Sequence, residues 1–87
     1  MKIKSDFILK KIAGSHVVVP LRTRAVDFSG IIKLSDSGAF LWKILEQGAD
    51  RSELIAKMLE EYAVDEATAA ADIDRFIDKL READLLE

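Results

Sequence analysis

The sequence predicts an α+β fold in which three strands come first and three helices follow. Residues 1–34 hold short runs rich in β-branched and aromatic side chains, separated by glycine, proline or polar connections. From Ser35 onward, three segments repeat apolar residues at intervals of three and four, and a residue that can cap a helix precedes each segment. Eighty-seven residues suit one domain, so we expect residues 1–87 to fold as a single unit.

Two strands that form a hairpin are predicted near the N-terminus, over residues 7–13 and 15–19. Gly14 lies between them and, with Ala13 and Ser15, predicts a tight turn. Pro20 ends the second strand, because proline has no N–H to donate to a strand ladder.

A third strand is predicted from residue 26 or 27 to Leu34. Phe28 and Ile32 share one face of this strand with Leu34, and Gly30 lies between them. With the hairpin, this strand completes a three-stranded antiparallel sheet in chain order.

The three predicted helices have recognisable starts and stops. The first begins after Ser35, a good N-cap, and stops at Gly48, and its apolar positions face several directions, which indicates a largely buried helix. The second opens with Asp50 and Glu53 at the spacing of a capping box. The third extends over residues 65–83 and carries one apolar stripe. The stripe consists of Ala69, Ala70, Ile73, Phe76, Ile77 and Leu80.

Composition excludes several classes of function. The chain has no cysteine, which removes disulfides, thiolate catalysis and cysteine-ligated metals. Its apolar runs are too short to cross a membrane, and its N-terminus lacks the pattern of a signal peptide, so we expect a cytoplasmic protein. Residues 1–34 hold seven basic and two acidic side chains, a net charge of +5, whereas residues 35–87 hold six and fourteen, a net charge of −8. The predicted sheet is therefore basic and the helices are acidic.

An ordered set of residues along the chain resembles the PqqD family, also called RiPP recognition elements. The set consists of residues 34–42, Gly48, residues 53–55, Asp72, Ile73, Phe76, Ile77, Leu80, Leu85 and Leu86. The resemblance covers residues 7–86 and implies a winged-helix-like β3α3 fold. Two positions depart from the family pattern: Ser35 replaces a common asparagine, and Asp84 replaces a usual glycine. Serine keeps an N-cap and aspartate tolerates the left-handed conformation, so we expect neither change to alter the fold.

The resemblance also implies a function. Members of this family hold the leader peptide of a ribosomally made precursor and present it to a modifying enzyme, often a radical S-adenosylmethionine enzyme. We therefore expect this protein not to be an enzyme itself. The expected partners are therefore a leader peptide and such an enzyme, with no cofactor or metal, no nucleic acid and no membrane, and the protein itself is expected to be a monomer or weak dimer.

The third strand is predicted to bind the peptide by strand addition. In a sheet in chain order, the first and third strands are edges with unpaired backbone groups. Lys10 and Lys11 guard the first edge, whereas the third has Lys33, no proline, and Gly30, at which another backbone can approach closely. The resemblance places the leader on the same strand. The predicted binding residues are Phe28, Ser29, Gly30, Ile31, Ile32, Lys33 and Leu34. The alternative is that the third helix or a terminal segment covers this edge.

Strand addition also requires an apolar groove. About five ladder hydrogen bonds contribute ~1 kcal/mol each, whereas ordering a peptide costs roughly 1–2 kcal/mol per residue. Burial of peptide side chains must supply most of the difference. The predicted groove residues on the third helix are Ile73, Phe76, Ile77 and Leu80, whose alternative role is the core. The predicted charged rim consists of Arg22, Arg24, Arg75 and Lys79.

Other functions are weaker interpretations. A winged-helix DNA-binding regulator is the main alternative, but residues 65–83 carry a net charge of −3, which opposes DNA. An enzyme would need more than the single His16, which has no nucleophile motif to accompany it. An adaptor that binds only the modifying enzyme stays open.

Overall fold

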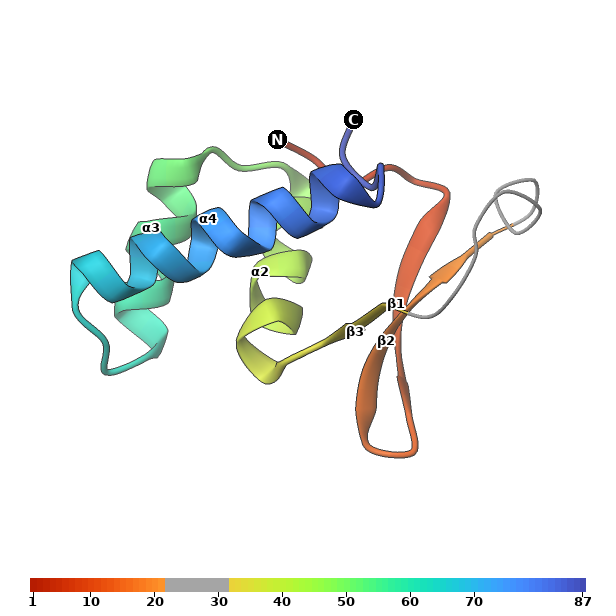
Figure 1. Cartoon of the computed structure of the whole chain (residues 1–87), viewed down its shortest axis with the longest axis horizontal. Coiled ribbons are helices and arrows are strands. Elements are labelled where there is room, and N and C mark those ends of the chain that lie inside the picture. The colour runs from red at the N-terminus through yellow and green to blue at the C-terminus, as the bar shows by residue number, and fades with distance from the viewer. Residues whose placement is uncertain (22–31) are drawn as a thin grey trace.

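The computed structural model describes residues 1–21 and 32–87. It contains a three-stranded antiparallel sheet in the order β1-β2-β3, followed by three helices (Figure 1). The strands are β1 (Phe7–Ile12), β2 (Ser15–Pro20) and β3 (Ile32–Leu34), and the helices are α2 (Asp36–Gln47), α3 (Arg51–Glu61) and α4 (Glu66–Glu82). The predicted α+β class and the predicted order of elements are confirmed.

A two-residue turn joins β1 to β2. Ala13 and Gly14 both have positive φ, 50° and 81°, as a type I′ hairpin turn requires. Ala13, predicted both to end the first strand and to take part in the turn, lies in the turn, whereas Ser15, also predicted for the turn, begins β2. Pro20 was predicted to lie just beyond the second strand, but it is the last residue of β2 and pairs with Phe7.

Within the described ranges, both outer strands of the sheet are edges. Among these residues β3 pairs only with β2, in a register that aligns His16 with Leu34 and Val18 with Ile32. Residues 22–31 lie outside the described part of the chain. The predictions for Phe28, Ser29, Gly30, Ile31, Arg22 and Arg24 therefore keep the status of predictions.

The helix boundaries are set by the capping residues that the sequence predicted. The N–H of Gly38 donates to Ser35 Oγ over 3.1 Å, and Asp50 and Glu53 form a complete capping box. Gly48 ends α2 with a φ of 93°, which favours glycine. The N–H of Thr68 donates to Asp65 Oδ1 over 2.7 Å at the start of α4.

The core lies between the helices and the inner face of the sheet. Trp42 and Leu45 of α2, Leu54 of α3 and Ile73 of α4 are each 0 % exposed. α4 crosses α2 and α3 and returns the chain toward its N-terminus (Figure 1). The apolar stripe of α4 is therefore the surface that joins the helices into one core.

The two ends of the chain lie side by side (Figure 1). Ile3 forms an isolated antiparallel bridge with Leu86, and the N–H of Glu87 donates to the Lys2 carbonyl over 2.9 Å. Asp84 precedes this contact with a φ of 57°, so it adopts the expected left-handed conformation. Across residues 1–21 and 32–87, no helix combines the length and hydrophobicity needed to cross a bilayer.

Candidate functional site

A groove of about 310 Å³ lies where β3 ends, α2 begins and α4 passes. Its apolar lining residues are Leu34, Gly38, Leu41, Met58 and Phe76, and its polar ones are Ser35, Ser37, Asp72, Arg75 and Lys79. The volume is at the lower end of the range for ligand clefts. The groove adjoins the last residue of a strand whose outer edge has no partner strand among the described residues.

The floor of the groove is apolar and closely packed. Leu34 and Phe76 are each 8 % exposed, so both side chains reach the groove from the core. Gly38 lies between them: an added Cβ would be 3.3 Å from Leu34 Cβ and 3.6 Å from Phe76 Cε1. A methyl group here would be in ordinary contact with Phe76 and would require Leu34 to shift by a few tenths of an ångström, so glycine relieves close packing at this point.

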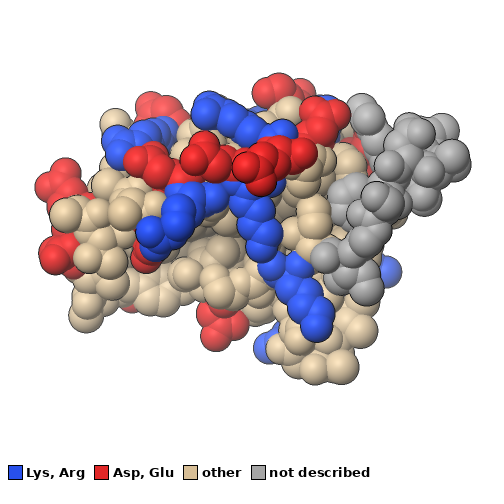
Figure 2. Space-filling model, viewed as in Figure 1, with Lys and Arg blue, Asp and Glu red and all other residues tan. Residues whose placement is uncertain are grey.

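The rim on α4 is charged. Arg75 pairs with Asp72, which lies one turn earlier on the same helix. Lys79 instead extends toward the sheet, and its Nζ donates to the Lys33 carbonyl of β3 over 3.0 Å. Figure 2 shows basic side chains extending from α4 across this face toward the sheet. The rim therefore joins α4 to the backbone of the edge strand.

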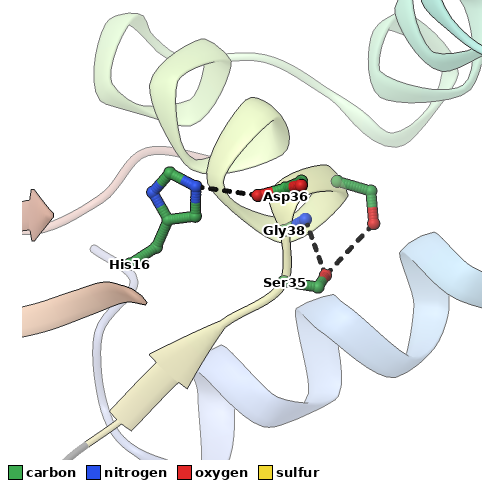
Figure 3. Close-up of polar contacts among 5 residues, drawn as sticks. His16, Ser35, Asp36 and Gly38 are labelled. Carbon is green, nitrogen blue, oxygen red and sulfur yellow. Dashed lines mark hydrogen bonds and ion pairs between the residues drawn. The ribbon is translucent and has the colours of Figure 1, made fainter. Parts of the chain in front are cut away.

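A polar contact joins the sheet to the start of α2 (Figure 3). His16 Nε2 on β2 donates to Asp36 Oδ1 over 3.0 Å, and Ser35 Oγ lies 3.2 Å from Ser37 Oγ. The imidazole thus faces a carboxylate, and the Ser35 hydroxyl is engaged as the N-cap. This arrangement positions the end of β3 and supplies no nucleophile with an adjacent base.

An ion pair positions α4 against α3. Arg51 donates to both carboxylate oxygens of Asp74, over 2.7 and 3.0 Å. The hydrogen bond from Arg51 holds the pKa of Asp74 below its ordinary value. Because α4 forms one wall of the groove, this bidentate contact helps to fix the position of that wall.

The structure brings only some of the predicted site residues together. Leu34, Phe76, Arg75 and Lys79 line the groove, and Ile32 and Lys33 lie on the adjacent strand. The others on α4 do not line it: Ile73 and Leu80 are 0 % exposed and Ile77 is 5 % exposed, so these three pack in the core. Which of them a peptide contacts stays a prediction.

Sequence reasoning missed six residues that line the groove. They are Ser35, Ser37, Gly38, Leu41, Asp72 and Met58. The first three belong to the capping segment of α2, so a glycine directly after a predicted N-cap was the available signal. Met58 carries no such signal, because only the packing of α3 against the other helices brings it here. No cluster of metal-ligating side chains occurs within the described ranges.

Comparisons with known proteins agree with this architecture. Residues 15–86 match the family model described as Coenzyme PQQ synthesis protein D (PqqD). The structure of TbiB1 in complex with the TbiA(beta) leader peptide is 29 % identical, with a TM-score of 0.78 over 100 % of this chain and 95 % of that one. Lasso peptide synthetase B1 complexed with the leader peptide is 18 % identical, with a TM-score of 0.71 over 93 % and 89 %, which shows a shared fold. A comparison with curated proteins found no match.

Proposed function

The chain belongs to the PqqD family, and on that premise we propose that it binds an extended leader peptide and presents it to a separate modifying enzyme. Two similar proteins have been solved in complex with leader peptides. The observation from this chain that carries the proposal is the outer edge of β3, which has no partner strand among residues 1–21 and 32–87 and lies beside the groove between α2 and α4.

Strand addition would use the backbone of β3 and the groove together. A peptide beside Ile32–Leu34 would form ladder hydrogen bonds with the open edge. Its side chains would alternate between the two faces, so every second one could point toward Leu34 and Phe76. Burying a large apolar side chain there would contribute roughly 1.5–3 kcal/mol, which backbone pairing alone does not provide.

The contribution to catalysis is proposed to be positional. The Ser35 hydroxyl, which lines the groove, is engaged in a helix cap, and His16 on β2 is engaged in a contact with Asp36. A protein of this kind raises the local concentration of precursor at its enzyme. We propose a radical S-adenosylmethionine enzyme as that partner, and a co-purification of the two proteins tests this assignment.

A DNA-binding role gains no support from the groove. α4 would be the recognition helix of a winged-helix protein, but its exposed surface mixes acidic and basic side chains (Figure 2). Asp72 and Asp74 each engage an arginine, so two of the arginines near α4 are already neutralised. DNA phosphates require a cluster of uncompensated cations.

Amide chemical shifts during a leader-peptide titration test the proposed site. The probe is the leader encoded beside this gene, and the control is a scrambled peptide of the same composition. We expect the largest shifts at Ile32–Leu34, at the start of α2 and along α4, and none with the scrambled peptide. Shifts confined to β1 would contradict the site, and an absence of shifts at millimolar peptide would contradict the function.

A further inference from the structure

The contact between Lys79 and Lys33 lies on the edge that the proposed peptide would use. The Lys33 carbonyl accepts from Lys79 Nζ, which reaches it from α4, outside the sheet. In an antiparallel ladder the N–H and C=O of one residue point to the same side. A Lys33 carbonyl that is open to α4 therefore indicates a Lys33 N–H that is open on that side as well.

The Lys79 ammonium binds the carbonyl oxygen that an added strand would use. A backbone N–H donor in a strand ladder lies about 2.9 Å from its carbonyl oxygen. Lys79 Nζ lies 3.0 Å from the Lys33 oxygen. A peptide N–H that pairs with Lys33 therefore competes with the ammonium for this acceptor.

Lys79 differs from the other charges of the groove. Arg75 is compensated by Asp72 on the same helix. Lys79 makes no ion pair within the described part of the chain, and its acceptor there is a neutral carbonyl. Its neighbours Asp78 and Glu82 on α4 also form no ion pair with it across those residues. A displaced Lys79 would thus leave a cation beside the bound peptide.

From these contacts we propose that Lys79 determines specificity for an acidic side chain in the bound peptide. In the free protein Lys79 caps the edge of β3 through the Lys33 carbonyl. When a peptide N–H takes this carbonyl, the ammonium moves to an Asp or Glu carboxylate of the peptide near Lys33. The inference rests on the proposed function, because it assumes strand addition at β3.

The contact between Lys79 and the Lys33 carbonyl would have two effects: it would protect the edge of β3, and it would favour acidic peptides. An exposed edge strand invites unwanted pairing, and a lysine on the edge is a common protection. A neutral peptide competes with Lys79 for the Lys33 carbonyl and offers the ammonium no new partner. An acidic peptide offers a carboxylate in exchange, so it is favoured over its neutral analogue.

Selection from a displayed library of random 15-residue peptides tests this inference. The baits are the wild-type protein, Lys79→Met, and the control Lys57→Met. Lys57 lies on α3 outside the groove lining and contacts Glu60 at 3.9 Å, so the control removes the same charge elsewhere. The selected peptides are then synthesised with each acidic residue and with its amide analogue, and their affinities are measured.

We expect peptides selected on the wild type to share an acidic residue at one position. Its change to the amide should weaken binding by about threefold to fivefold, the range of a partly exposed ion pair. Lys79→Met should remove this difference and bind the amide peptide at least as tightly as the wild type does, whereas Lys57→Met should preserve the difference.

The selection also separates a failure of the inference about Lys79 from a failure of the proposed function. Peptides that bind without an acidic preference, or a preference that survives in Lys79→Met, would overturn the role of Lys79 and leave strand addition intact. A failure of every bait to select any peptide would contradict the proposed function, and the inference would fail with it.

Discussion

At the scale of single residues, Gly38 has two roles: it takes part in the cap of α2, and it lines the groove. It follows the N-cap Ser35, whose hydroxyl accepts its N–H. Leu34 and Phe76 lie so close to it that an added Cβ would be 3.3 Å from Leu34 Cβ and 3.6 Å from Phe76 Cε1. One residue therefore both takes part in the start of the helix and leaves space for the groove.

Enlarging residue 38 is predicted to fill the groove. Gly38→Leu should weaken leader binding by about tenfold or more, because it removes space for a side chain worth roughly 1.5–3 kcal/mol. Gly38→Ala adds a single methyl group and should have a smaller effect. Titration calorimetry measures both variants, and circular dichroism checks that each is folded. Equal affinity for all three proteins would show that the peptide does not enter the groove.

The sequence correctly predicted the conformation of single residues where it depends on a few neighbours along the chain. Ser35, Asp50, Asp65 and Gly48 cap their helices as expected, because a cap depends on a few neighbouring residues. Asp84 adopts the left-handed conformation for the same local reason. The lining of the groove depends on distant residues and was predicted only in part.

At the scale of elements, α4 shows why that prediction was partial. Its apolar stripe was correctly predicted, since buried positions recur every three or four residues. The sequence does not separate Phe76, which reaches the groove, from Ile73 and Leu80, which face the core. That separation is set by where β3 and α2 pack against the helix.

Acidic pH is predicted to weaken two contacts of α4, the ion pair between Asp74 and Arg51 and the N-terminal cap at Asp65, and so to lower the stability of the fold. The hydrogen bond from Arg51 lowers the pKa of Asp74, and the hydrogen bonds with Thr68 lower the pKa of Asp65. A carboxyl group whose pKa is lowered in the folded state stabilises that state above its ordinary pKa. This stabilisation is lost as the pH falls below about 4, when the group becomes protonated.

Urea unfolding at pH 7 and pH 3 measures this effect. Asp74→Asn should lower the free energy of unfolding at pH 7 and should reduce the difference between the two pH values. The control is Asp78→Asn, an exposed aspartate on the same helix whose side chain makes no ion pair or hydrogen bond within the described residues. An equal effect of both substitutions would show that the contact with Arg51 does not stabilise the fold.

At the scale of the whole molecule, the charge is divided along the chain. Residues 1–34 carry +5 and residues 35–87 carry −8. The strands β1, β2 and β3 carry Lys10, Lys11 and Lys33 and no acidic residue, and such a basic sheet increases the rate at which an acidic peptide associates. The distribution was visible in the sequence, whereas its relation to the groove required the fold.

If the protein acts by holding the precursor near the enzyme, a covalent linker between this protein and the enzyme should compensate for weak binding of the leader peptide. A fusion of this protein to its modifying enzyme through a flexible linker should restore modification of a precursor whose leader binds weakly. Product formation is measured by mass spectrometry over a series of linker lengths, with the unfused pair as control. Failure of every length, with both proteins folded, would indicate that the protein acts on the enzyme by another mechanism.

The central claim is that the peptide binds as a strand added to β3, and an N-methyl scan of the leader tests it most directly. In an added strand, alternate N–H groups face the sheet edge, so N-methylation there removes a hydrogen bond and introduces a clash. We predict that affinity falls by about tenfold at every second position along the segment beside Ile32–Leu34, and changes little at the positions between. Sensitivity at every third or fourth position, or at none, would contradict strand addition.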